Sequence, residues 1–91
     1  MDNLRYAAID TGSNAIRLLI ADVVENSGII SFKKTLFIRI PLRLGSDSFE
    51  DQKISDNKAK DLVRTMNAFS YLMKVFKVKD YMACATSAMR E

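Results

Sequence analysis

The hydrophobic pattern of this chain changes its period near residue 54, and the change limits which folds are available to it. From Ile30 to Leu42 most even-numbered residues are apolar and most odd-numbered residues are polar, which is typical of a half-exposed β-strand. Between Ile54 and Val78 apolar residues recur every three or four positions, which predicts an amphipathic helix of about six turns, over about residues 55–77. The two periods together predict an α/β fold.

Three further apolar runs are predicted to be strands. Two of them, 4–10 and 15–24, precede the strand at 30–42, and the third, 81–85, follows the helix. Short turns between the first three strands predict an antiparallel meander. Pro41 has no amide hydrogen to donate, so the third strand is expected to lie at a sheet edge or to end there. The run at 81–85 is apolar on both faces, which predicts a central strand.

The helix lies between the third and fourth strands and is predicted to act as a crossover, which places the fourth strand parallel to the first. In a mixed sheet of order 3-2-1-4, the carboxyl ends of the first and fourth strands lie side by side. Ligands of open α/β sheets bind at such ends. The turn at 10–14 and the segment 85–88 are therefore expected to meet at one place.

The turn after the first strand carries more polar groups than a hairpin needs. The amides of Gly12, Ser13 and Asn14 can donate to an anion, and the hydroxyls of Thr11 and Ser13 are further donors. The carboxylate of Asp10 only accepts hydrogen bonds, and it is suited to hold a magnesium ion through water or to orient a nucleophilic water. The turn therefore predicts a phosphate site, although the chain has no Walker loop.

A second group of donors is predicted after the fourth strand. Thr86 and Ser87 are suited to cap a helix that begins at Ala88, and the first amides of such a helix favour a phosphate. The guanidinium groups of Arg17 and Arg90 can bind phosphate oxygens in pairs. The convergence of the two segments favours a shared phosphate site.

Each of these features also has an ordinary explanation. Asp, Gly and Asn are standard turn residues, and Thr-Ser is a common helix cap. Arg17 and Arg90 could simply be exposed charges. These explanations stay open at this point, because single motifs of this kind occur in many proteins without a ligand.

Composition argues against several classes of function. The chain has no histidine, so imidazole bases and histidine metal sites are excluded. Its lysines and arginines are scattered and its net charge is only +3, so no nucleic-acid surface is expected. No apolar run approaches the ~20 residues of a membrane helix, and the first residues lack the pattern of a signal peptide. One cysteine, Cys84, cannot form an internal disulfide, which suits the cytoplasm.

Three segments resemble the exopolyphosphatase and guanosine pentaphosphate phosphohydrolase family. AAIDTGSNAIRLLI at 7–20 is similar to its first phosphate loop, PLRLG at 41–45 to its arginine-leucine-glycine segment, and ACATSAMRE at 83–91 to its ATSAxR motif. The resemblance implies an actin-like ATPase fold built from ribonuclease-H-like halves. It also implies magnesium-assisted hydrolysis of phosphoanhydride bonds in polyphosphate or guanosine pentaphosphate.

The same resemblance assigns roles to individual residues. Those it places around the phosphates are Gly12, Ser13, Asn14, Arg17, Thr86, Ser87 and Arg90. Ala15 departs from the serine that is usual in the family. The catalytic glutamate, the second phosphate loop and the second lobe of the family lie beyond residue 91. Residues 1–91 are therefore expected to be an incomplete N-terminal lobe that is inactive alone.

Two other functions stay open from the sequence. One is a non-catalytic fragment that acts by binding another protein, and the other is the first lobe of an enzyme like the sugar and acetate kinases.

The single long helix can cover only one face of the sheet. A homodimer is therefore expected, either through the bare face or through the edge of the fourth strand.

Overall fold

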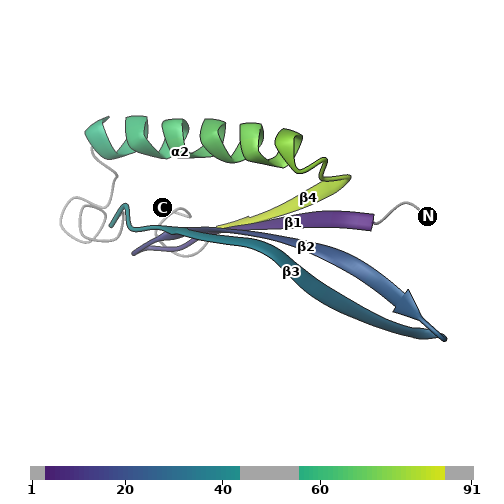
Figure 1. Cartoon of the computed structure of the whole chain (residues 1–91). Helices are drawn as coiled ribbons and strands as arrows, with labels where there is room; N and C mark the ends of the chain where they lie inside the picture. The colour runs from purple at the N-terminus through teal and green to yellow at the C-terminus, as the bar shows by residue number, and fades with distance from the viewer. Residues whose placement is uncertain (1–3, 44–55, 86–91) are drawn as a thin grey trace.

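The computed structural model describes residues 4–43 and 56–85, which form one sheet with a helix across it (Figure 1). The elements are β1 (Leu4–Thr11), β2 (Ile16–Asn26), β3 (Ile29–Ile40), α2 (Asp56–Val75) and β4 (Asp80–Ala85). Figure 1 shows α2 running along one side of the sheet, while β2 and β3 extend beyond it as a long hairpin.

The strand order is β3-β2-β1-β4, as predicted. β1 pairs antiparallel with β2 and parallel with β4, so the predicted crossover is confirmed. β3 lies at an edge and ends at Ile40, immediately before Pro41, which also agrees with the sequence. The expectation that 81–85 is a central strand is wrong: β4 forms the other edge, and all six of its residues are exposed. Its apolar sequence is therefore not explained by burial among the described residues.

The core lies between α2 and one face of β1 and β2. Phe69 of α2 is fully buried, and it packs on side chains of the two strands, namely Ala7, Ile9, Ile16, Leu18 and Ile20. Further residues of the helix face pack around this cluster at intervals of three or four, namely Leu62, Met66, Leu72 and Met73. The helical period read from the sequence thus corresponds to the face that contacts the sheet.

α2 ends at Val75, two residues before the predicted end, because the chain reverses there. Lys77 adopts a left-handed conformation (φ 57°), and its amide donates to the Lys74 carbonyl at 3.1 Å. The Val78 amide donates to the Met73 carbonyl at 2.9 Å. These two bonds form a Schellman motif with a lysine at the position usually taken by glycine.

Within residues 4–43 and 56–85, no helix is long and apolar enough to cross a membrane.

The hairpin of β2 and β3 contains a β-bulge that changes which residues face α2. Ser27 (φ 54°) and Gly28 (φ 83°) form its two-residue turn, as expected of a type I′ hairpin. Leu36 pairs with Ile20, but Lys34 pairs with Ala21, so Thr35 is an extra residue in β3. The even-numbered apolar residues therefore do not share one face, contrary to the expected alternation. Leu36, on the α2 side, packs against the core, whereas Phe32 is 74% exposed on the opposite side.

Arg5 ties the connection between α2 and β4 to the sheet. Its guanidinium contacts both carboxylate oxygens of Asp22, at 2.6 and 3.2 Å, and donates to the Phe76 carbonyl at 2.8 Å. Its own carbonyl accepts from the Lys79 amide at 2.7 Å. Asp22 is buried, and hydrogen bonding to Arg5 lowers its pKa below the ordinary value of a carboxyl. Through these bonds Arg5 holds the segment that leads from α2 into β4 against the sheet, beside β1.

Candidate functional site

The carboxyl ends of β1 and β4 lie side by side, as the predicted topology requires. Thr11, the last residue of β1, pairs with Ala85, the last residue of β4, and Asp10 pairs with Cys84. The turn after β1 therefore starts beside the point where β4 ends. Thr86, Ser87 and Arg90 lie outside the described residues, so their predicted part in the site is untested and stays a prediction.

The turn between β1 and β2 is closed by its own backbone. The Gly12 amide donates to the Ala15 carbonyl at 2.9 Å. A Cβ at residue 12 would lie 3.2 Å from that carbonyl oxygen, a tight contact that glycine avoids. The Gly12 amide is thus occupied by the turn. Within the described ranges, the amides of Ser13 and Asn14 make no hydrogen bond, and they are the two that can receive an anion.

Asp10 and Thr11, adjacent in sequence, project from opposite faces of the sheet. Thr11 follows the alternation of Ala7 and Ile9 and is buried on the α2 side. Asp10 is half exposed on the side without the helix. The structure therefore places the Asp10 carboxylate on the face of the sheet that α2 leaves open. The hydroxyl of Thr11, which was predicted to donate to the phosphate, lies on the face that α2 covers.

Arg17 lies beside the turn, as predicted, and faces Asp10 across β1 and β2. The Arg17 Nη1 atom is 3.3 Å from the Asp10 Oδ2 atom, and the two side chains are 40% and 48% exposed. A Cβ at residue 12 would be 3.7 Å from the same Nη1 atom. An accessible guanidinium next to a glycine turn can bind a phosphate oxygen.

Among the described residues of the site, Asp10 is the one carboxylate that could take part in metal binding. Among the described residues, no group of three or more histidine, cysteine, aspartate or glutamate side chains could hold an ion. Asp10 alone fits a magnesium ion whose other ligands are water and substrate phosphate, because magnesium commonly keeps several waters and takes only one or two carboxylates.

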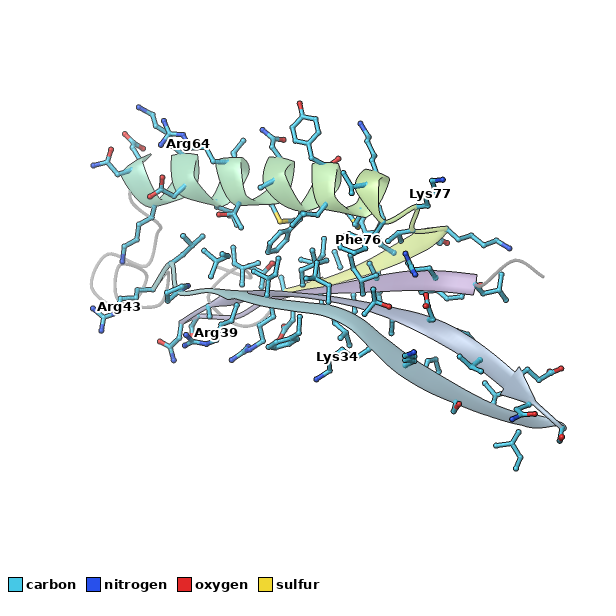
Figure 2. All side chains as sticks on the ribbon, in the orientation of Figure 1. Lys34, Arg39, Arg43, Arg64, Phe76 and Lys77 are labelled. Atoms are coloured by element: carbon cyan, nitrogen blue, oxygen red, sulfur yellow. The ribbon has the colours of Figure 1, made fainter. Side chains whose placement is uncertain are left out.

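Arg43 is a site neighbour that reasoning from single residues did not identify. Its amide donates to the Asn14 carbonyl at 2.9 Å, and its own carbonyl accepts from Lys58 Nζ of α2 at 2.6 Å. It adopts a left-handed conformation (φ 58°). The only signal in the sequence was the PLRLG segment, to which no role in the site was assigned. The segment after β3 thus joins the turn to the first turn of α2, and Figure 2 shows Arg43 at that end of the molecule.

Comparison with known proteins shows the same fold in a group of phosphatases. The chain is similar to the Ppx/GppA family member of Aquifex aeolicus, with 28% identity and a TM-score of 0.84 over 98% of this chain and 28% of that one. It is also similar in fold to an exopolyphosphatase from Cytophaga hutchinsonii, with 24% identity and a TM-score of 0.81 over 94% of this chain and 26% of that one.

A protein found by sequence similarity also carries the word phosphatase in its name. The bifunctional 3-dehydroquinate synthase/phosphatase of Fusobacterium nucleatum is 27% identical over 93 residues, which cover 99% of this chain and 14% of that protein. No protein-family model matches the sequence. The chain thus spans little more than a quarter of the solved structures it matches. The resemblance to the exopolyphosphatase family and the actin-like fold are confirmed, with the four-stranded sheet in the expected order.

Proposed function

We propose that this chain is part of a Ppx/GppA-type phosphatase and that its turn at residues 12–15 binds a phosphate group of polyphosphate or guanosine pentaphosphate. The observation that carries the proposal is the position of the turn. It lies at the adjoining carboxyl ends of β1 and β4, with the half-exposed Arg17 beside it. Ligands of open α/β sheets bind at such ends. Similarity to phosphatases of this fold supports the choice of a phosphate as ligand.

Each residue in and beside the turn would have its own role in phosphate binding. The amides of Ser13 and Asn14 donate to phosphate oxygens, and the Arg17 guanidinium neutralises their charge. Asp10 holds Arg17 in place through their ion pair and would retain a magnesium ion through water. The ion, when bound, supplies charge neutralisation on the phosphates. Gly12 keeps the turn closed, so that the amides at its tip stay in position.

Hydrolysis is proposed only for a longer protein that contains this segment. Phosphoryl transfer needs a group that positions the attacking water in addition to phosphate ligands. Among the described residues near the turn, the one carboxylate is Asp10, and it is paired with Arg17. We therefore expect the 91-residue chain to bind phosphates without useful turnover.

The exposed free thiol of Cys84 supports a reducing compartment such as the cytoplasm.

Titration of the isotope-labelled chain with inorganic phosphate tests the site. We expect the amide signals of Ser13 and Asn14 to shift with millimolar affinity, worth roughly 4 kcal/mol, because only one loop contributes. Arg17→Gln should weaken binding about tenfold, since a charged donor is lost. Lys60→Gln, which makes the same charge change on α2, is the control. Shifts confined to other parts of the chain, or an equal loss in both variants, would contradict the proposal.

A further inference from the structure

We infer that Arg39 extends the phosphate site across the open face of the sheet, so that the site takes a chain of linked phosphates rather than a single one. The inference builds on the proposed function of the turn. It concerns a residue that neither the sequence motifs nor the turn itself points to.

The register of three strands places Arg39 in line with the site. Arg39 of β3 is directly opposite Arg17 of β2, and Arg17 is directly opposite Asp10 of β1. Residues opposite one another on an antiparallel pair lie on one face, with Cβ atoms about 4.5–5.5 Å apart. Figure 2 shows Arg39 on the side of the sheet away from α2. The three side chains form a row that leads from the turn toward the β3 edge.

The charges in this row are not balanced by the residues that the structure describes. Two guanidinium groups share one carboxylate, and Arg17 is the one that pairs with it, at 3.3 Å. Arg39 is exposed and makes no ion pair with any described residue. Like charges directly opposite each other destabilise a sheet. An anion that contacts both arginines would remove this repulsion, and guanidinium groups bind phosphate oxygens in pairs.

The position of Arg39 also indicates the length of the ligand. Neighbouring strands lie about 4.8 Å apart, so Arg39 is one strand farther than Arg17 from β1, where the turn begins. A single phosphate held by the amides of Ser13 and Asn14 can use Arg17. A second phosphate linked to the first can lie over the sheet between Arg17 and Arg39. The row therefore favours linear polyphosphate, or the diphosphate arm of a nucleotide, over orthophosphate.

Paired titrations of the 91-residue chain with orthophosphate and tripolyphosphate test the inference. We expect the unaltered chain to bind tripolyphosphate more tightly, and Arg39→Gln to weaken that binding about tenfold while orthophosphate binding changes less than about twofold. Arg39→Lys should lose part of the effect, because lysine keeps the charge but not the paired donors. Arg64→Gln is the matched control, since Arg64 is exposed on α2, away from the sheet.

The possible results separate the two proposals. If orthophosphate and tripolyphosphate leave the signals of Ser13 and Asn14 unchanged, both the turn site and its extension are overturned. If both ligands bind at the turn and Arg39→Gln affects neither, or both equally, only the extension is overturned. An equal loss in Arg64→Gln would show that net charge, not the row of arginines, governs binding. Adenosine diphosphate, used as a third ligand, shows whether a diphosphate arm is enough to gain the contribution of Arg39.

Discussion

Asp22 is a carboxylate on the covered face of the sheet, and Arg5 is the residue that does most to compensate its charge. The Arg5 guanidinium contacts both of its oxygens, and this hydrogen bonding lowers the Asp22 pKa. The folded protein therefore releases the Asp22 proton more readily than the unfolded chain does. The stability that this pair contributes is fully present above the ordinary carboxyl pKa of about 3.9, and it is lost as the pH falls through the lowered value.

Asp22→Asn tests this linkage at the level of one residue. We expect the variant to have a lower free energy of unfolding at pH 7, because the amide cannot compensate the charge of Arg5. The difference from the unaltered chain should become smaller as the pH falls below about 4. Urea unfolding at pH 7 and pH 3 measures both values.

Asp61→Asn provides the control for that measurement. Asp61 pairs with Arg64 on the exposed surface of α2, so little change is expected at either pH. A difference between Asp22→Asn and the unaltered chain that stays constant from pH 7 to pH 3 would contradict the assigned titration.

At the scale of single elements, the end of α2 is conformationally strained, and the sequence around Lys77 has no glycine that would indicate a left-handed residue there. Lys77 occupies the left-handed position of the Schellman motif, which side chains with a Cβ adopt at a cost of about 1–2 kcal/mol. Lys77→Gly removes this cost but gives the unfolded chain more freedom, worth about 0.4–1 kcal/mol. We therefore expect a net stabilisation of about 0.5 kcal/mol or slightly more, measured by urea unfolding.

Lys74→Gly is the matched variant for this test. It places glycine inside the last turn of the same helix, where it should destabilise by about 1 kcal/mol. Opposite signs for the two lysine-to-glycine changes are the expected result. Destabilisation by Lys77→Gly as large as that of Lys74→Gly would show that the Lys77 side chain, not its backbone, matters for the fold.

At the scale of the whole molecule, the side of the sheet away from α2 and the edge strand β4 leave apolar side chains exposed. Tyr6, Phe37 and Met82 are each more than a third exposed. Lys34 and Arg39 also lie on this side (Figure 2), so two copies meeting face to face would bring like charges together. Edge-to-edge pairing of β4 with a second copy avoids this repulsion. The expected homodimer is therefore proposed to form through β4.

Sedimentation at micromolar concentration tests that proposal. The unaltered chain should sediment as a dimer, and Met82→Lys should shift it to monomer, because a charged residue on an edge strand opposes pairing. Val63→Lys makes a similar change on the exposed surface of α2 and should leave the dimer intact. A monomeric unaltered chain, or equal dissociation by both variants, would contradict pairing through β4.

The local pattern of the sequence was enough to predict the strands and the helix among the described residues and their order in the sheet. The change of period near residue 54 separates strand from helix, and the helix between two strands predicts the parallel pairing of β1 with β4. The same reasoning predicted that Arg17 lies beside the glycine turn, since few residues separate them. These features depend on neighbours in sequence and on general rules of connection.

Only the tertiary structure decided which groups of the candidate site are available. The bond from Gly12 to Ala15 occupies one predicted donor, and the alternation of β1 places Thr11 on the covered face. The bulge at Thr35 determines which residues of β3 face α2, and the pairing of β2 with β3 places Arg39 opposite Arg17. Strand register depends on contacts between residues far apart in sequence, and one extra residue reverses the face of all that follow. No local pattern contains that information.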